Sequence, residues 1–420
     1  MSPRRPIQNI LVTCCRASAL CVVNAGTWVS ALLFIGQSCV IAQDDGPVSV
    51  LVVVSAPEFA KETAPQLYLA GSLPALGNWA PDGLLLERQA DNTYHAAFAA
   101  LPGTTIQFKV TCGSWQTVER DARGRDIPNR QIDVKPQPAG QVQRVEIIVG
   151  SWAQGDELLQ STVVGRLIKH EFRSKTLGNS RTIAVWLPST YDTRQERYPV
   201  LYMHDGQNLF DKATAAFGQE WQVDEAVTTL IDAGEIPPMV IVGIWNTADR
   251  IDEYTMTVDA RMNAGGAGRL YLEFVVDELK PWIDNEYRTD PSRDTTWIGG
   301  SSLGALISLH ACIERPEVFA GCLAFSPSLG WDREQLLTAI AEKQKSWPLQ
   351  SRLWLSMGTH EGGNPESHAA NTRRAAQMAE VLIEQGLEPD VSLWHRSFEN
   401  DRHDEVSWAK QFPAALRAIK

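Results

Sequence analysis

The sequence predicts a two-part α/β protein in which a small all-β sandwich precedes a doubly wound parallel sheet with helices on both faces. Residues 48–149 hold short β-rich runs between Gly, Pro, Asn and Asp turns, a pattern typical of a small antiparallel sandwich. After Arg181, apolar β runs alternate with helical stretches, which is the pattern of a parallel sheet. The 420 residues suffice for two or three domains of about 100–200 residues each.

The first region is expected to be a sandwich domain over residues 43–152. Its strands are expected at residues 48–54, 66–70, 94–98, 106–110 and 142–149. Turn signals separate these runs, namely Gly77-Asn78, Pro81-Asp82-Gly83 and Pro102-Gly103. Gly and Asn tolerate the left-handed backbone of tight turns, and Pro presets its φ. Residues 153–171 are interpreted as a linker.

The second region, residues 172–420, is expected to be the α/β domain. Its β runs lie at residues 183–187, 199–203, 239–245, 295–298, 321–325, 353–356 and 391–394, and its clearest helical stretches at 270–283 and 303–313. In such a sheet, functional loops follow the carboxyl ends of the strands.

The first 42 residues are expected to be an export signal. They contain Arg4, Arg5 and Arg16 but no Asp, Glu or Lys, and they run through apolar segments to the small residue Ala42, where signal peptidase would cleave. The mature protein would then be secreted or periplasmic. The alternative is an uncleaved membrane anchor, although polar residues interrupt the run before it reaches the ~20 apolar residues of a span.

Composition excludes several partners. The formal net charge of −12, from 38 Lys and Arg against 50 Asp and Glu, gives no basic surface for nucleic acid and makes polyanions poor substrates. Four of the seven Cys precede residue 43, so no disulfide scaffold is expected; Cys312 and Cys322 either pair or remain buried thiols. No spaced Cys/His set predicts zinc, and we expect neither metal nor cofactor.

The sharpest chemical signal is the Gly-Ser-Ser-Leu-Gly run at residues 300–304, between the β run at 295–298 and a helical stretch. A nucleophile elbow needs this context, because a strained strand-to-helix turn exposes the serine Oγ at a helix N-terminus. The flanking glycines let the backbone pass close to its neighbours. Ser302 is therefore the predicted nucleophile. The alternative, a Gly-rich phosphate or packing turn, lacks a following Lys.

A serine nucleophile needs a base and an acid, which this fold places later in the chain. Glu361 comes shortly after the β run at 353–356, and His403 follows the last β run. His403 would take the Ser302 proton and return it to the leaving alcohol, while Glu361 orients the imidazole.

Other residues compete for these two roles. Asp401 and Asp404 are reserve acids. His360 and His368 lie before or beside the acid, and the remaining candidates, expected to serve packing or support, are His204, His310 and His395.

The oxyanion of a tetrahedral intermediate needs two backbone N–H donors. Leu303, directly after the nucleophile, is the first. The second is expected in the loop at residues 203–208, where we assign Gln207, with Gly206 and Asn208 as alternatives.

Together these motifs resemble the putative-esterase family. The residues that carry the resemblance are 198–210, Arg250 with Glu253-Tyr254, 279–283 with Tyr287-Arg288, 300–304, Ser326-Pro327-Ser328 and His403 with Trp408. The resemblance spans about residues 172–419 and implies an α/β-hydrolase fold with the triad Ser302, Glu361 and His403. The family holds feruloyl and acetyl-xylan esterases, siderophore esterases, S-formylglutathione hydrolase and mycolyltransferases, so the resemblance does not choose a substrate. Ala305, where many members have Gly, is a departure.

Three tryptophans are candidate substrate contacts. Trp221, Trp245 and Trp331 fall on loops at strand ends, where an indole would stack on a sugar or an aromatic acyl group. The alternative is packing in the core.

The first region resembles the starch-binding module family over about residues 47–152. The resemblance is carried by residues 68–72, 76–79, 81–83, 108–109, 113–116 and 128–130. It implies an α-glucan site with Trp79 and Lys109. The family's second stacking Trp is replaced by Gly-Arg-Asp at residues 124–126, so the module either binds glucan or only shields the hydrolase.

The predicted function is an exported serine esterase that hydrolyses an acyl ester, attached to a carbohydrate, without cofactor or metal. The alternatives are a siderophore or lactone esterase, an acyltransferase of the same fold, and a catalytically silent glycan-binding protein.

Overall fold

A computed structural model describes residues 46–57, 66–124, 127, 129–138, 140–153, 161–348 and 350–419. The expected export signal, residues 1–42, lies outside the described residues, as do residues 154–160 of the expected linker. Residues 45–420 group into one compact unit. No helix in the described ranges combines the length and the apolar character that crossing a membrane requires.

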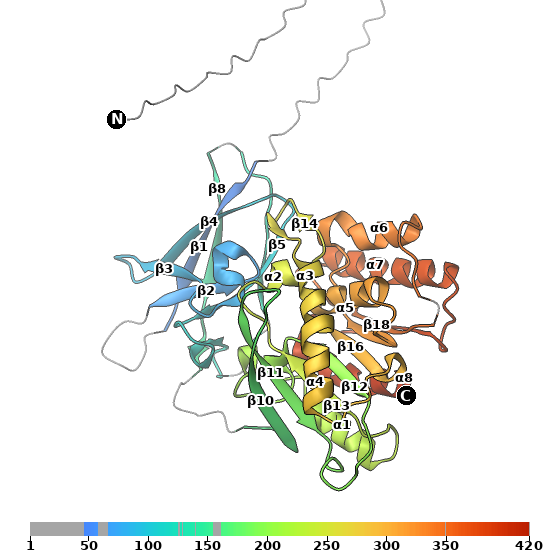
Figure 1. Cartoon of the computed structure of the whole chain (residues 1–420). Coiled ribbons are helices and arrows are strands. Elements are labelled where there is room, and N and C mark those ends of the chain that lie inside the picture. Colours follow the sequence, from blue (N-terminus) through green and yellow to red (C-terminus); the bar gives the residue numbers. More distant parts are fainter. Residues whose placement is uncertain are drawn as a thin grey trace, which may run out of the picture. The chain divides into compact units, whose positions relative to one another are not determined.

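The first region forms a seven-stranded sheet in the order β7-β5-β2-β3-β4-β1-β8 (Figure 1). These strands are β1 (Val48–Ser55), β2 (Leu67–Gly71), β3 (Leu84–Arg88), β4 (Tyr94–Ala100), β5 (Thr105–Thr111), β7 (Arg130–Asp133) and β8 (Val142–Ile148). Two short strands, β6 (Glu119–Arg120) and β9 (Ser151–Trp152), pair separately, and the 3-10 turns are η1 (Pro74–Trp79) and η2 (Trp115–Thr117). Alternate residues of β4 face the core, as the period of a half-buried strand requires.

One pair in this sheet departs from the expected antiparallel sandwich. β1 pairs antiparallel with β4 but parallel with β8. Parallel neighbours need a crossover connection rather than a hairpin, and here β8 arrives from β7 at the opposite edge of the sheet. Residue alternation is the same in both pairings, so the sequence pattern does not report strand direction.

The second region contains an eight-stranded sheet in the order β10-β11-β13-β12-β16-β17-β18-β19. Its strands are β10 (Arg166–Arg173), β11 (Ser180–Leu187), β12 (Val200–His204), β13 (Val240–Ile244), β16 (Thr296–Ser301), β17 (Gly321–Phe325), β18 (Arg352–Gly358) and β19 (Leu393–Phe398). The strands from β13 to β19 are parallel, whereas β10 and β11 run antiparallel to their neighbours. The α/β architecture is confirmed, and the expectation of a parallel sheet is wrong at this edge, where β10 and β11 pair antiparallel.

Helices cover both faces of this sheet. They are α1 (Val223–Asp232), α2 (Arg250–Glu253), α3 (Gly268–Glu273), α4 (Lys280–Glu286), α5 (Leu303–Glu314), α6 (Gln335–Ala341), α7 (Pro365–Glu384) and α8 (Glu405–Ile419), with a π-helix, η5 (Phe274–Leu279), joining α3 to α4. Shorter elements are β14 (Val258–Asp259), β15 (Ala264–Gly265), η3 (Gly206–Asn208), η4 (Ala216–Gly218), η6 (Arg293–Thr295) and η7 (Trp331–Glu334).

The core divides along the sheet. Tyr202 of β12 packs in the cluster that contains α3, α4 and α5, whereas Leu201 and Met203 pack in the cluster that contains α1 and α8. The carboxyl ends of β12, β16, β17, β18 and β19 therefore lie at one edge of a sheet that is covered on both sides, which is where α/β proteins bind ligands.

The thiols in the described residues are free. Cys312 and Cys322 are buried, Cys112 is partly buried, and none forms a disulfide. Burial chiefly, and the neighbouring Cys312, raise the pKa of Cys322 well above its usual value, so this thiol is an inert core group.

Candidate active site

Ser302 occupies a sharp turn between β16 and α5. Its φ of 57° and ψ of −121° are strained for a residue other than glycine. Main-chain bonds hold the turn: the Ser302 N–H donates to the Phe325 carbonyl at 3.1 Å, and the Ser302 carbonyl accepts from the Leu306 N–H at 3.1 Å. The turn therefore has the strand, bend and helix of a nucleophile elbow.

The glycines beside Ser302 let this turn close over His204. A Cβ on Gly300 would lie 3.1 Å from the His204 Cβ, and one on Gly304 would lie 3.0 Å from it. Burial lowers the pKa of His204 to about 3, so its ring is neutral, and its Nδ1 lies 2.9 Å from the Tyr271 hydroxyl. His204 thus supports the elbow from inside the core.

Glu361 and His403 meet beyond the ends of β18 and β19. His403 Nδ1 lies 2.8 Å from Glu361 Oε2; the Glu361 side chain is 1% exposed and that of His403 is 22% exposed. Two donors hold the other carboxylate oxygen, because Gly358 N–H and the Ser326 hydroxyl donate to Oε1 at 2.6 and 2.5 Å. With Nδ1 directed at Glu361, the Nε2 atom of His403 is left for a reacting group.

The reserve acids have other partners. Asp401 accepts hydrogen bonds from Lys410 Nζ at 2.6 Å and from Gln411 Nε2 at 3.0 Å. Asp404 accepts from the Ser407 N–H at 2.9 Å at the start of α8. Both carboxylates thus hold the segment around the imidazole, and neither is hydrogen-bonded to it.

The other histidines stand apart from the triad geometry. The rings of His360 and His368 lie 5.2 Å apart, and His368 Nε2 is 3.0 Å from the Gly362 carbonyl. Burial lowers the pKa of His310 to about 3 and also lowers the pKa of His395. These rings serve loop structure and packing.

The hydroxyl of Ser302 is hydrogen-bonded to a second serine and not to an imidazole. Its Oγ lies 3.1 Å from the Ser328 Oγ, and the Ser328 N–H donates to the Ser302 carbonyl at 3.1 Å. No hydrogen bond joins Ser302 to His403 in the part of the chain that the structure describes. Catalytic hydrogen bonds of free enzymes often form only when substrate is bound.

The expected oxyanion donors lie at the start of α5 and within η3, at the same sheet edge. Leu303 is the first residue of α5, and Gln207 lies in η3 directly after β12. Asp205 binds Arg250 through both oxygens, at 2.7 and 2.8 Å. Burial alone would raise the pKa of Asp205, but Arg250 outweighs it and holds the pKa below its usual value. This ion pair, to which sequence reasoning assigns no role, anchors the loop that carries Gln207.

A further carboxyl group joins the loops of Gln207 and His403. Glu405 begins α8, and its Oε1 accepts from Asn208 Nδ2 at 3.3 Å. Burial chiefly, with repulsion from nearby carboxylates, raises the pKa of Glu405 to about 7. The sequence offers no signal for it beyond its position two residues after His403.

The expected substrate-contacting tryptophans divide into one buried and two partly exposed side chains. Trp221 is 3% exposed and packs edge-on against Phe325, with ring centroids 5.2 Å apart. A substrate contact is therefore wrong for Trp221, because the aromatic cluster against α8 encloses it. Trp245 and Trp331 are partly exposed, and Trp331 Nε1 donates to the Thr257 carbonyl at 3.0 Å.

The two expected glucan-binding residues also differ. Trp79 ends η1 with a φ of 71° and is partly exposed. Lys109 is 3% exposed, and its Nζ donates to the Ile127 carbonyl. A direct glucan contact by Lys109 is therefore wrong, because its ammonium group is directed at the main chain inside the module.

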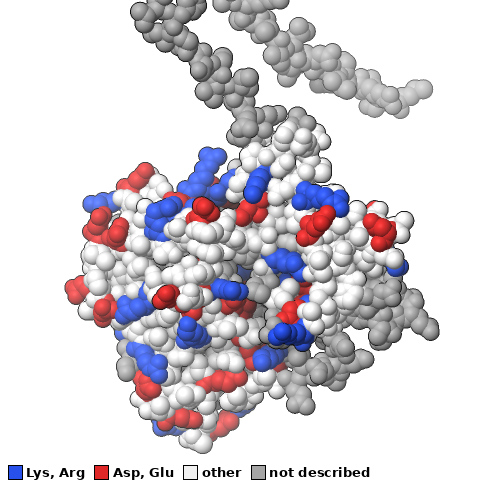
Figure 2. Space-filling model, turned by 180° about the vertical axis from the view of Figure 1, so that it is seen from behind, with Lys and Arg blue, Asp and Glu red and all other residues white. Residues whose placement is uncertain are grey.

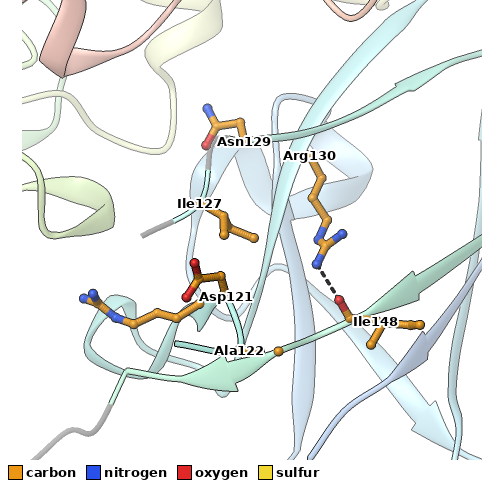
Figure 3. Close-up of a pocket in the computed structure, with 8 residues that line it drawn as sticks. Asp121, Ala122, Ile127, Asn129, Arg130 and Ile148 are labelled. Carbon is orange, nitrogen blue, oxygen red and sulfur yellow. Dashed lines mark hydrogen bonds between the residues drawn. The ribbon is translucent and has the colours of Figure 1, made fainter. Parts of the chain in front are cut away.

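A pocket of about 460 Å³ opens in the same region (Figure 3). Its lining includes Asp121, Asn129 and Arg130, and the guanidinium of Arg130 donates to the Ile148 carbonyl at 2.8 Å. This pocket is separate from the residues around Ser302.

Charge and metal-binding groups are dispersed. Acidic and basic side chains are interspersed on the face that Figure 2 shows. Across the described ranges, no three His, Cys, Asp or Glu side chains are grouped so that they could hold a metal ion.

Comparison with known proteins shows one family. Residues 174–419 match the family model described as "Putative esterase". The ferri-bacillibactin esterase BesA of Bacillus subtilis (strain 168) is 28% identical over 211 residues, which are 45% of this chain and 69% of BesA. The endo-1,4-beta-xylanase/feruloyl esterase of Xylanibacter ruminicola is 24% identical over 242 residues, 56% of this chain and 30% of that protein.

A solved structure has a similar fold. The enterobactin esterase of Shigella flexneri, crystallised with 2,3-dihydroxy-N-benzoyl-glycine, matches 90% of this chain and 97% of its own with a TM-score of 0.50 and 16% identity. At that identity the likeness concerns the fold alone.

Proposed function

The chain belongs to the family of putative esterases, and from this membership we propose a carboxylic-ester hydrolase with Ser302 as nucleophile, His403 as general base and Glu361 as orienting acid. The observation that carries the proposal is the 2.8 Å contact between His403 Nδ1 and Glu361 Oε2. It lies at the sheet edge where the strained turn presents Ser302. Nucleophile, acid and base follow three parallel strands of one sheet, in the chain order Ser, Glu, His of α/β-hydrolases.

The reaction proceeds in two halves. Ser302 Oγ attacks the ester carbonyl as its proton passes to His403 Nε2; the C–O bond to the alcohol then breaks, and the same proton leaves with the alcohol. Water repeats the sequence on the acyl-enzyme, and the acid departs with Ser302 restored. Glu361 stays ionised and stabilises the imidazolium of each step.

The oxyanion of each step is bound by main-chain donors. The Leu303 N–H lies at the N-terminus of α5, whose positive dipole end favours a developing negative charge. The Gln207 N–H supplies the second donor from η3, and the Asp205–Arg250 ion pair holds that loop in place. In the acylation step Ser302 exchanges its Ser328 partner for His403.

The substrate we propose is an acyl ester on a carbohydrate, and the setting is outside the cytoplasm, secreted or periplasmic. Support comes from the partly exposed Trp245 and Trp331, which suit stacking on a sugar or an aromatic acyl group, and from the feruloyl esterase among the relatives. A siderophore or lactone ester is the alternative favoured by BesA. An acyltransferase would use the same acyl-enzyme with an alcohol in place of water.

Hydrolysis of a p-nitrophenyl ester by the purified full chain tests the mechanism. Ser302→Ala is expected to lower kcat by several orders of magnitude, because it deletes the nucleophile. Ser301→Ala removes a neighbouring buried hydroxyl from the same turn and is the matched control, expected to retain activity. Retention of activity in folded Ser302→Ala would overturn the assignment. Feruloylated arabinose and a catecholate trilactone then separate the two substrate classes.

Glucan binding by the first region is a separate proposal that rests on Trp79. Its indole is partly exposed at the end of a turn, where a flat sugar face could stack. We expect retardation in amylose-loaded gels that Trp79→Ala abolishes. If amylose changes the mobility of neither protein, the first region does not bind glucan, and covering the hydrolase domain would be its role.

A further inference from the structure

A chain of hydrogen bonds reaches Glu361 from the side opposite His403. Trp408 lies on α8, and Ser326 directly follows β17. Trp408 Nε1 donates to Ser326 Oγ at 2.9 Å, and Ser326 Oγ donates to Glu361 Oε1 at 2.5 Å. The side chains are enclosed: Trp408 is 5% exposed, and Ser326 and Glu361 are each 1% exposed.

Chemistry fixes the direction of both bonds. An indole N–H only donates, so the Ser326 oxygen must be the acceptor from Trp408. The single hydroxyl proton of Ser326 is then available for Glu361, which as a carboxylate only accepts. A donor that is itself hydrogen-bonded in this way is polarised, and a bond to an ionised acceptor in a water-free site is among the stronger ones.

The position of Ser326 leaves its hydroxyl little freedom. Its φ of 46° is unusual for serine, and its N–H donates to the Ser356 carbonyl at 2.8 Å. The main chain of Ser326 is therefore held against β18, the strand that leads to Glu361. The backbone conformation of the turn, rather than free rotation of the side chain, sets the direction of the hydroxyl.

Trp408 touches the base as well as supporting the acid. Its ring stands edge-on to the His403 ring, with centroids 5.1 Å apart and an interplanar angle of 83°. One side chain on α8 thus packs against the imidazole and, through Ser326, holds the carboxylate that the imidazole binds.

We propose that Trp408 and Ser326 form a donor relay that positions Glu361 against His403, an inference that rests on the triad of the proposed function. With Ser326 and the Gly358 N–H on Oε1, only Oε2 faces the imidazole. Without Ser326 the carboxylate retains one donor on Oε1 and can rotate, so His403 is presented in more than one orientation. We therefore expect the rate of the chemical steps, measured by kcat, to fall, and substrate binding, measured by KM, to stay nearly unchanged.

The test compares variants of the full chain in ester hydrolysis. Ser326→Ala is expected to lower kcat roughly 10- to 100-fold with KM nearly unchanged, a smaller loss than removal of a triad member. Trp408→Phe keeps a ring beside His403 but deletes the N–H, and a loss of a few-fold is expected. In a relay the second change adds nothing once Ser326 is absent, so the double variant should match Ser326→Ala.

Ser351→Ala is the matched control. Ser351 is a buried serine directly before β18 whose hydroxyl accepts from Arg293 Nη2 at 3.1 Å, so its loss removes a similar hydrogen bond at the amino end of the strand, away from Glu361. Its kcat should stay at the wild-type level. A readout independent of rate is the low-field proton resonance of the His403–Glu361 hydrogen bond, which should shift in Ser326→Ala and persist unchanged in Ser351→Ala.

The outcomes separate the relay from the triad. Wild-type kcat in Ser326→Ala, equal losses in Ser326→Ala and Ser351→Ala, or additive losses in the double variant would overturn the relay. If Ser326→Ala does not fold, an unchanged kcat and proton resonance in Trp408→Phe would overturn it as well. Ser302→Ala, assayed beside these variants, reports on the proposed function alone, because its activity must vanish whether or not the relay exists.

Discussion

At the scale of single residues, hydrogen-bond partners decide which carboxylate serves His403. Glu361→Gln should lower kcat by about 100- to 10,000-fold, because a neutral amide no longer stabilises the imidazolium and can select the wrong tautomer. Asp404→Asn should leave kcat within a few-fold, since Asn caps a helix as well as Asp. Ester hydrolysis, with circular dichroism as the check on folding, measures both. If the Asp404→Asn variant were inactive and the Glu361→Gln variant active, Asp404 and not Glu361 would be the orienting acid.

Glu405 provides a pH-dependent prediction. Its folded pKa of about 7 lies above the ordinary glutamate value of 4.5, so between these two pH values the folded state keeps a proton that the unfolded chain has released. Stability from this group therefore falls as pH rises from the unfolded to the folded pKa and stays low above it. Glu405→Gln should gain in Tm relative to wild type between pH 5 and pH 8, as measured by thermal melts.

The control for this effect is Glu366→Gln. Glu366 is also a first-turn glutamate, on α7, but it is exposed, so its substitution should shift Tm equally at both pH values. A Tm difference between Glu405→Gln and wild type that does not change with pH would contradict the assignment.

The sequence indicates where topology places a residue, but it does not indicate which side chains are buried. Ser302, Glu361 and His403 each follow a strand of one sheet, so strand order alone brings them to one edge. Trp221 also lies near that edge, but which loop aromatic turns inward depends on packing against α8, which the local pattern does not report. Ser326 and Trp408 belong to motifs that carry the family resemblance, but the motifs assign them no role, and only the hydrogen bonds from Trp408 to Ser326 and from Ser326 to Glu361 suggest one.

At the scale of elements, the elbow depends on how closely β16 and α5 approach β12. Gly304→Ala places a Cβ 3.0 Å from the Cβ of His204, a tight contact that α5 or His204 must relieve by moving a few tenths of an ångström. We expect a loss of about 1–3 kcal/mol in unfolding free energy and a reduced kcat, because Ser302 and Leu303 move with the helix. Urea denaturation and ester hydrolysis measure the two effects.

Gly234→Ala is the comparison for this prediction. Gly234 follows α1 and has a φ of 68°, and a Cβ at this position would have no neighbouring atom within 4 Å. Alanine there strains the backbone without touching the elbow. Its stability should fall while kcat persists. Full activity in Gly304→Ala would mean that the turn tolerates the displacement.

The sequence predicts a strand where the apolar run is continuous, and it misses a strand whose apolar run is broken by polar residues. Most of β10 falls in the range interpreted as a linker, because it is an edge strand whose residues are partly or fully exposed and lacks the apolar run of a central strand. The predicted direction of β8 and β11 is wrong for a different reason. Pairing depends on which distant segments meet, and alternation along one strand contains no information on its partner.

At the scale of the whole molecule, the two sheets belong to one compact unit, and a polar contact joins the first region to the loop that follows Glu361. Asn364 precedes α7 shortly after Glu361, where its Oδ1 accepts from the Ser367 N–H at 2.8 Å. Its Nδ2 donates to Asp133 Oδ2 of β7 at 2.5 Å. The loop that holds the acid is therefore tied both to its own helix and to the first region.

Exchanging donor and acceptor tests this tie. Asn364→Asp keeps the helix cap but sets two carboxylates against each other, so we expect a loss of about 1–3 kcal/mol in unfolding free energy and a lower kcat as the Glu361 loop is displaced. Adding Asp133→Asn restores one donor and one acceptor and should recover both quantities. Thr105→Val removes a hydrogen bond to the other carboxylate oxygen of Asp133, within the first sheet, and should leave kcat unchanged. If the double variant recovers neither the unfolding free energy nor kcat, the first region does not support the loop that carries Glu361.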